Sequence, residues 1–464
     1  MPSERGVNET RSGATGASGL ERDGAIAVPG HSLKRNILFA MLGNGVLNLC
    51  RFAVVVLLAK FAGEQVQGTF TYTSIAWAVP VVLFCGLELR AAFVADAGGE
   101  FTFGAYRALR SLGMGAASVV LLVVVLWTTR SEASVTLVWM MLAICAGRIV
   151  FHQAEVYWGV YQRRERLDLM AWSNALRGAT MLAPFAILLM WPRLAGHAES
   201  NETTPERLMQ VAAWAVSIYV VAWAAIWWLF DRRLVVGHAD VNLSWDWPAL
   251  WKLAKQTLPL GLVFLLINLC ETVTQWFVKR AAGGEGWSEL GYFGALRFIT
   301  LGATFLIVQV STAAGNRLAN YYQKDLRSFV RLATKLTGAA VALGVTILAA
   351  AWLFGEWFLR VVYTAKYAQH YFEFLILVSA QAVVVLATVF GFVTTHMRQF
   401  WIQVPVQVSV LAVTAVAAML LVQPEDPVRG GAWTMVVRSS TQAVLYFGCV
   451  LIGIRWRDRI LASR

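Results

Sequence analysis

The sequence predicts an all-α polytopic membrane protein with about 12 transmembrane helices, arranged as two parallel six-helix lobes around a central cavity. Three observations support this prediction: an apolar composition, long apolar runs without strand-like alternation, and a repeat of the first run halfway along the chain. Of 464 residues, 58% are hydrophobic and 14% are charged, and the mean hydropathy is +0.59. A bilayer core about 30 Å thick needs roughly 20 apolar residues per helix. Helices are therefore the expected spanning element.

The apolar runs form two sets of six. The first set covers residues 36–58, 69–89, 108–127, 134–157, 169–191 and 208–230. The second covers 256–278, 290–312, 330–353, 371–394, 401–422 and 432–454. We therefore expect four segments: a disordered cytoplasmic tail (1–32), an N-terminal lobe (33–230), a cytoplasmic linker (231–252) and a C-terminal lobe (253–464). Pro80 and Pro259 make the second and seventh spans candidates for bending.

The first span is repeated 220 residues later, where Leu33–Gly63 aligns without a gap to Leu253–Gly283. The two segments are identical at eight of 31 positions, including one unbroken Asn-Leu-Cys triplet. Arg51 follows this triplet in the first copy and Glu271 follows it in the second. Because an even number of spans separates the copies, they cross the membrane in the same direction. The lobes are thus predicted to be parallel repeats.

The net charge of +12 comes from basic residues at the ends of apolar runs, so it indicates membrane topology and no nucleic-acid partner is expected. The same residues predict the orientation in the membrane. A cytoplasmic N-terminus places 22 Lys and Arg residues near span ends on the cytoplasmic side and nine on the other. This bias predicts that both termini are cytoplasmic. We expect a multi-pass protein of the bacterial cytoplasmic (inner) membrane that contacts membrane lipids and functions as a monomer.

Charged and polar side chains inside the spans are the candidate functional residues, because an intramembrane charge needs a partner or a wet cavity. Two repeat-related spans have polar faces at helical spacing. In the first span this face consists of Asn44, Asn48 and Arg51, and in the seventh of Asn268, Glu271, Thr272 and Gln275. Other spans add Arg148, His152 and Glu155 in the fourth, Arg177 in the fifth, Arg297 in the eighth and Arg438 in the twelfth.

Five arginines against two glutamates predict a cationic interior and an anionic substrate. Arginine suits phosphate, since its planar fork donates to two oxygens and stays charged when dehydrated. Arg51 and Glu271 could instead form a salt bridge; we expect them to line the lobe interface, and we interpret Arg148, Glu155 and His152 as an internal salt-bridge group. His152 and Glu155 are too few for a metal site. Glu271 is the candidate for coupling to H⁺ or Na⁺.

Five short motifs lie near the starts and ends of spans: Leu33-Lys34-Arg35-Asn36, Phe61-Ala62-Gly63-Glu64, Gly68-Thr69-Phe70, Leu258-Pro259-Leu260 and Leu290-Gly291-Tyr292. With these motifs the sequence resembles the polysaccharide transport flippases of the O-antigen and exopolysaccharide type, within the multidrug, oligosaccharidyl-lipid and polysaccharide exporter superfamily. The resemblance covers residues 33–454 in span count and two-lobe layout.

This resemblance implies a transporter, not an enzyme, that flips a polyprenyl-pyrophosphate-linked oligosaccharide to the outer leaflet by alternating access. It implies that spans 1, 2, 7 and 8 line the cavity and that Arg51, Glu271 and Arg297 contact the substrate. Arg177 and Arg438 join Arg148 and Glu155 as secondary cavity or structural residues. No cofactor is expected, and a glycan polymerase and glycosyltransferases are the expected partners.

Two other functions stay open. A cation-coupled multidrug exporter of the same superfamily would prefer acidic residues in its cavity, which the arginine excess opposes. A membrane glycosyltransferase would need an acidic pair in an early external loop, where only Glu64 occurs, and a polymerase would need a large external loop. Both enzymes fit the sequence less well than a transporter.

Overall fold

Twelve helices of the described chain are long and apolar enough to cross a membrane, which confirms the predicted all-α fold class. The computed structural model describes residues 33–96, 99–130, 132, 134–194, 204–236, 242–397 and 402–457, and this part contains helices and connections but no strand. The predicted tail at 1–32 lies outside the described residues.

The N-terminal half forms spans one to six. The first span is α1 (Leu33–Leu57) with the π-helical η1 (Leu58–Ala62). The second consists of α2 (Glu64–Thr71), the π-helical η2 (Tyr72–Ala78), α3 (Val79–Gly86) and α4 (Leu89–Ala95). The others are α5 (Phe103–Thr128), α6 (Val135–Arg163), α7 (Leu167–Leu194), and α8 (Pro205–Ile226) continued by η4 (Trp227–Asp231) and α9 (Arg232–Val236).

The C-terminal half forms spans seven to twelve. These elements are α10 (Trp247–Ala281), the short η5 (Gly283–Glu285), α11 (Gly286–Lys324), α12 (Leu326–Val362), α13 (Ala365–Ala368), α14 (Tyr371–His396), α15 (Gln403–Leu421) and α16 (Pro427–Arg455). Helices α11 and α12 contain 39 and 37 residues, so they extend well beyond the predicted spans. The apolar runs end where polar residues begin, whereas the helices continue through them.

The second span is interrupted near Pro80, where a bend was predicted. The π-helical stretch η2 precedes Pro80, which lies at the start of α3 and has no N–H to donate. After α3, Leu87 and Glu88 adopt left-handed backbone angles, with φ of 51° and 46°. In contrast, α10 runs through Pro259 without interruption.

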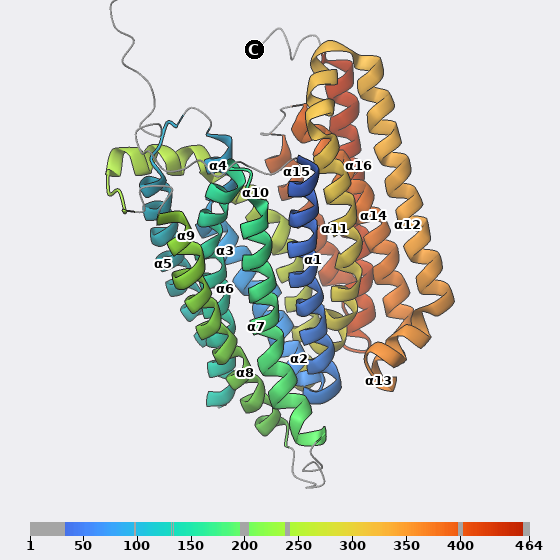
Figure 1. Cartoon of the computed structure of the whole chain (residues 1–464). Helices are drawn as coiled ribbons and strands as arrows, with labels where there is room; N and C mark the ends of the chain where they lie inside the picture. The colour runs from blue at the N-terminus through green and yellow to red at the C-terminus, as the bar shows by residue number, and fades with distance from the viewer. Residues whose placement is uncertain are drawn as a thin grey trace, which may run out of the picture.

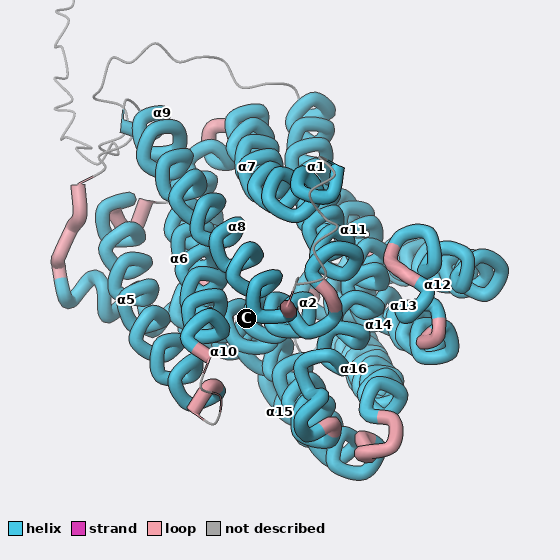
Figure 2. The backbone as a smooth tube through the Cα atoms, turned by 90° about the horizontal axis from the view of Figure 1, so that it is seen from below, coloured by secondary structure: helices cyan, strands magenta, loops and turns pink. Residues whose placement is uncertain are grey.

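The two halves of the chain lie largely side by side, as Figures 1 and 2 show from two directions. Within the N-terminal half, α1 packs along α7, and α8 packs along α6 and α7. Within the other half, α14 packs along α11, α12 and α16. We call the N-terminal half, spans one to six, the N lobe and the C-terminal half, spans seven to twelve, the C lobe. The second span forms most of the contact between them, through α2 against α11 and through η2 and α3 against α10.

Helices α2 and α11 cross at very short range. A Cβ atom added to Gly68 would overlap the backbone oxygen of Trp287, and one added to Gly291 would overlap the backbone oxygen of Glu64. Small residues permit such close approach of helices within a membrane. This crossing fixes how near the two lobes can lie.

Further contacts join the lobes at the distal end, defined as the end of the bundle opposite the start of α1 and the C-terminus (Figure 1). Trp287 Nε1 donates to both carboxylate oxygens of Glu132, each at 2.9 Å, and Lys279 Nζ lies 3.4 Å from Glu132 Oε1. Lys366 Nζ pairs with Glu64 Oε1 at 3.0 Å. The distal end is therefore closed by polar contacts between lobes.

Candidate functional site

A pocket with two arginines lies at the inner side of the N lobe, and we call it the N-lobe chamber. It encloses about 480 Å³ of space, part of it open to solvent. Its lining comes from α1, the second span, α6, α7, α8 and, from the C lobe, α11. The lining residues are Arg51, Val55, Phe70, Thr71, Ser74, Ile75, Arg148, Met181, Tyr219, Trp223 and Phe298, none of which is acidic.

Arg51 reaches the N-lobe chamber from α1. Its Nη1 lies 3.5 Å from Asn48 Oδ1, at the limit of a hydrogen bond, and its Cζ lies 4.9 Å from the ring centroid of Phe151. Within the described part of the chain, Arg51 forms no ion pair and its buried Nη2 has no hydrogen-bond partner. Arg51 is thus a partly buried cation with free donor capacity.

Arg148 lies opposite on α6 and is held by Ser74. Its Nε and Nη2 donate to Ser74 Oγ at 3.1 and 2.5 Å. Ser74 belongs to η2, and π-helical segments often occur at functional sites. A hydroxyl acceptor leaves the charge of Arg148 unneutralised, so the chamber keeps two positive charges.

The expected ion pair of Arg148 with Glu155 is not formed. Seven residues along a helix separate two side chains by about 10 Å of rise, which is too far for a contact. Glu155 Oε2 instead lies 2.7 Å from His152 Nδ1, one turn away. The interpretation of these three residues as one salt-bridge group was therefore wrong for Arg148.

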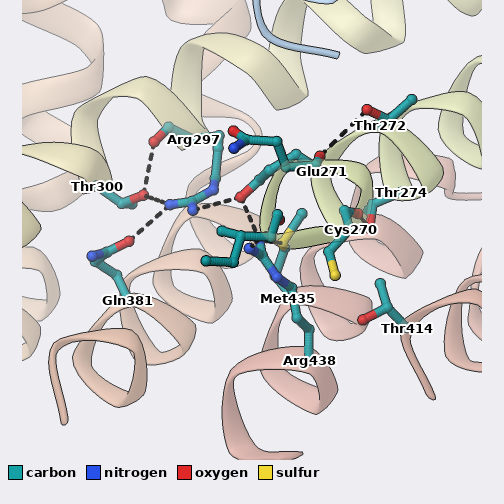
Figure 3. A network of polar contacts seen from close by, with 12 residues as sticks. Cys270, Glu271, Thr272, Thr274, Arg297, Thr300, Gln381, Thr414, Met435 and Arg438 are labelled. Atoms are coloured by element: carbon teal, nitrogen blue, oxygen red, sulfur yellow. Dashed lines mark hydrogen bonds and ion pairs between the residues drawn. The ribbon is translucent and has the colours of Figure 1, made fainter. Parts of the chain in front are cut away.

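Glu271 lies in the C lobe between two other arginines (Figure 3). Its Oε1 accepts from Arg297 Nη2 at 2.8 Å and from Arg438 Nη1 at 2.5 Å. These residues come from α10, α11 and α16, and we call them the C-lobe cluster. The alternative in which Arg51 pairs with Glu271 is not realised, because each residue faces a group within its own lobe.

The C-lobe cluster borders a second, smaller pocket of about 210 Å³. Arg297 Nη1 also donates to Gln381 Oε1 at 2.8 Å and to Thr300 Oγ1 at 2.7 Å. The pocket is lined by Arg297, Leu377, Ala380, Gln381, Val384, Met435 and Arg438. Helix α11 separates the two pockets, since Arg297 lines one and its neighbour Phe298 lines the other.

The remaining predicted polar residues have other surroundings. Asn44 Oδ1 accepts from Asn174 Nδ2 at 2.9 Å, which joins α1 to α7. Asn48 is exposed beside Arg51, and Asn268 Nδ2 donates to the backbone oxygen of Phe264 at 2.7 Å. Gln275 is only 1% exposed, and neither atom of its amide has a hydrogen-bond partner in the described structure.

Arg177 forms an ion pair that the sequence did not reveal. Its Nη2 lies 2.6 Å from Asp231 Oδ2, and neither side chain is exposed. Asp231 appeared to belong to the linker because it ends an apolar run next to two arginines. The structure continues the sixth span through it, so this buried ion pair joins the fifth and sixth spans within the N lobe.

Several pocket residues carried no charge signal in the sequence. Ser74, Tyr219, Trp223 and Phe298 lie within apolar runs, where a short hydroxyl or an aromatic ring resembles ordinary helix packing. Gln381 is uncharged, and no charged residue lies one turn away from it along its span. Among the described residues, no group of three or more His, Cys, Asp or Glu side chains is arranged to hold a metal ion.

Comparison with solved structures shows that this fold is similar to known ones. An inward-facing MATE family multidrug resistance transporter of the MOP superfamily superposes with a TM-score of 0.65 over 91% of this chain and 99% of its own, at 14% sequence identity. An outward-facing transporter of that family gives 0.58 over 93% and 96%, at 15% identity. The chain has the MATE transporter fold.

A third similar structure is a MOP superfamily transporter from Pyrococcus furiosus, for which reverse polarity of the binding pocket suggests a different function. Its TM-score is 0.60 over 92% of this chain and 95% of its own, at 17% identity. No family model matches the sequence, and no curated protein is similar to it. The MATE transporter fold is therefore supported by structural similarity alone, and the substrate class is inferred from the residues of the site.

Proposed function

We propose that this protein is an alternating-access transporter that flips a polyprenyl-pyrophosphate-linked oligosaccharide to the outer leaflet. The observation that carries the proposal is the pair Arg51 and Arg148 in a pocket without an acidic lining residue. Guanidinium groups freed from water bind phosphate oxygens strongly. Such a pocket favours an anionic headgroup.

The aromatic lining supports the same substrate class. Phe70, Tyr219, Trp223 and Phe298 surround the two arginines, so the pocket combines apolar surface with a few polar groups, as small-ligand sites do. The chamber also touches α11 of the other lobe through Phe298. Relative movement of the lobes would change the chamber, which alternating access requires.

Multidrug export is the second candidate function, and the fold favours it. The similar structures include multidrug resistance transporters of the MATE family. A cationic drug would meet two arginines and no acidic lining residue in the N-lobe chamber, and like charges placed side by side repel. A multidrug transporter with this chamber would therefore take neutral or anionic compounds.

Ion coupling is assigned to Glu271 as part of this proposal. A sodium ion would have to approach a carboxylate oxygen that two guanidinium groups already contact. A proton would instead neutralise Glu271 and release both arginines. Proton coupling therefore fits the geometry better than sodium coupling. The inner-membrane location, the monomeric state and the glycan-assembly partners remain part of the proposal.

The proposed function is tested by Arg51→Ala and Arg148→Ala in cells that depend on this protein for export of a lipid-linked glycan. Loss of one charge-assisted phosphate contact should reduce export roughly tenfold or more. Arg360→Ala is the matched control, because the Arg360 side chain is 64% exposed on α12. Wild-type export by both chamber variants, at equal amounts in the membrane, would contradict the assignment.

A further inference from the structure

The C-lobe cluster carries more positive than negative charge. Arg297 and Arg438 are each only 7% exposed, and Glu271 is the acidic side chain that contacts them. One positive charge is therefore left over in a buried place. An uncompensated buried charge is strongly destabilising unless a counterion or hydrogen bonds offset it.

The hydrogen bonding of the cluster is also incomplete. Both arginines donate to the same oxygen, Glu271 Oε1. In the described structure, Glu271 Oε2 and the Nε atoms of both arginines are buried without a partner. Buried polar groups normally have partners, so these two unused Nε donors point to a missing acceptor.

A narrow pocket adjoins the two arginines of the cluster. Arg297, Arg438 and Gln381 line the pocket of about 210 Å³ together with apolar side chains of α14 and α16. A phosphate group has several acceptor oxygens and a negative charge, so it could satisfy both guanidinium groups at once. The cluster thus offers cations and donors in one place, and displacement of the Glu271 carboxylate would provide the space that a phosphate group needs.

The internal repeat shows why Glu271 is present. Arg51 and Glu271 occupy equivalent positions in the first helix of each lobe, and each faces its own lobe's arginines. The N-lobe chamber has two arginines and no acid, whereas the C-lobe cluster has two arginines and one acid. Without Glu271, the C lobe would hold the same pair of free cations as the N lobe.

We propose that the C-lobe cluster is a second phosphate-binding site, which the Glu271 carboxylate occupies until a phosphate group displaces it. This inference rests on the proposed function only for the source of the phosphate, which is either free in solution or part of the lipid-linked substrate. Helix α11 contributes to both sites, since Arg297 lines the C-lobe pocket and Phe298 lines the N-lobe chamber.

The site is tested by phosphate binding to the purified full-length protein in detergent, with calorimetry and thermal unfolding as readouts. Glu271→Gln removes the competing charge and should bind inorganic phosphate at least about tenfold more tightly than the wild type. Phosphate should also raise its unfolding temperature more than that of the wild type. Glu356→Gln is the matched control, since Glu356 is 57% exposed on α12.

Two further variants keep the test decisive. Arg438→Gln leaves Arg297 and Glu271 balanced, so this variant should fold and should lose the wild-type response to phosphate. The double variant Arg51→Gln, Arg148→Gln abolishes phosphate binding by the N-lobe chamber. Adding Glu271→Gln to this double variant should still increase its affinity for phosphate. The site is overturned if Glu271→Gln binds phosphate no more tightly than the wild type, or if the gain survives loss of Arg297 and Arg438.

A second probe distinguishes the two sources. If Glu271→Gln also binds a polyprenyl monophosphate more tightly, the site accepts a lipid headgroup; if only inorganic phosphate gains, the site is for the free anion. The outcome is separable from the transport proposal. Reduced export by Arg51→Ala without any phosphate effect of Glu271→Gln would reject this site alone, and the reverse result would reject the transported substrate alone.

Discussion

At the scale of single residues, the buried charges of this protein divide into those that are neutralised and those that are not. Arg177 is paired with Asp231, which also accepts from Ser173 Oγ at 2.8 Å. Arg51 and Arg148 contact amide, hydroxyl and aromatic groups, and neither contacts a carboxylate of the described residues. The first arrangement stabilises the N lobe, whereas the second leaves charge available for a ligand.

We expect Asp231→Asn to destabilise the protein by about 3–5 kcal/mol, because it leaves Arg177 buried and unpaired. Thermal unfolding in detergent measures this loss. Glu356→Gln breaks an exposed i,i+4 pair with Arg360 and should change stability by less than about 1 kcal/mol. Equal effects of the two substitutions would show that burial of the Arg177–Asp231 pair has no energetic consequence.

The sequence could place these charges in spans but could not pair them. Helical spacing grouped Glu271 with Thr272 on one face, but Glu271 contacts arginines of the C lobe whereas Thr272 donates to the backbone oxygen of Ala76 in the N lobe. It could not show that Arg297 and Arg438, 141 positions apart, contact one carboxylate oxygen. Pairing depends on how helices from distant parts of the chain pack, and the periodicity of one helix contains no information about its neighbours.

At the scale of secondary-structure elements, the second span is the part that joins the lobes. Its α2 segment crosses α11 at Gly68 and Gly291, and Thr272 of α10 donates a hydrogen bond to the backbone oxygen of Ala76 in η2. The same span supplies Ser74 to the N-lobe chamber. Movement between the lobes would therefore be transmitted to the chamber through this span.

We expect Gly68→Ala to push α2 away from α11 and to loosen the distal end, because its Cβ has no space beside Trp287. Spin labels on Arg130 and Arg280, both exposed near the distal contacts, measure the separation in a cysteine-free variant. Gly68→Ala should lengthen and broaden that distance. Gly45→Ala is the control, since no atom lies near its added Cβ, and an unchanged distance in Gly68→Ala would refute the close crossing.

The positions of the spans could be predicted from the sequence, whereas the irregular segments within them could not. All twelve spans were expected, because roughly 20 apolar residues per helix is a strong and local signal. The left-handed turn at Leu87 and Glu88 and the π-helical η2 depend on packing against other helices. Pro80 marked the irregular region but not its form.

At the scale of the whole molecule, the lobes are held together at the distal end by Glu132, Trp287, Lys279, Glu64 and Lys366. The TM-score is 0.65 with the inward-facing MATE transporter and 0.58 with the outward-facing one. Under the predicted orientation the distal end faces away from the cytoplasm. The distal contacts would then have to break when the protein opens outward.

The sequence suggested one central chamber shared by Arg51 and Glu271, whereas in the described structure Arg51 lines the N-lobe chamber and the arginines that contact Glu271 line a different pocket across α11. The repeat predicts that these residues occupy equivalent positions in two helices. Equivalent positions in parallel repeats face equivalent surroundings, and here each faces its own lobe. This consequence of the repeat accounts for the difference between the predicted chamber and the observed pockets.

The charge of the N-lobe chamber is the central claim, and one reconstitution measures it directly. Purified protein in liposomes is offered a fluorescent polyprenyl-pyrophosphate-linked oligosaccharide or the cationic dye ethidium, each with an imposed proton gradient. We predict translocation of the anionic lipid, its loss in Arg51→Ala combined with Arg148→Ala, and no movement of ethidium. Transport of ethidium without movement of the lipid would contradict the account.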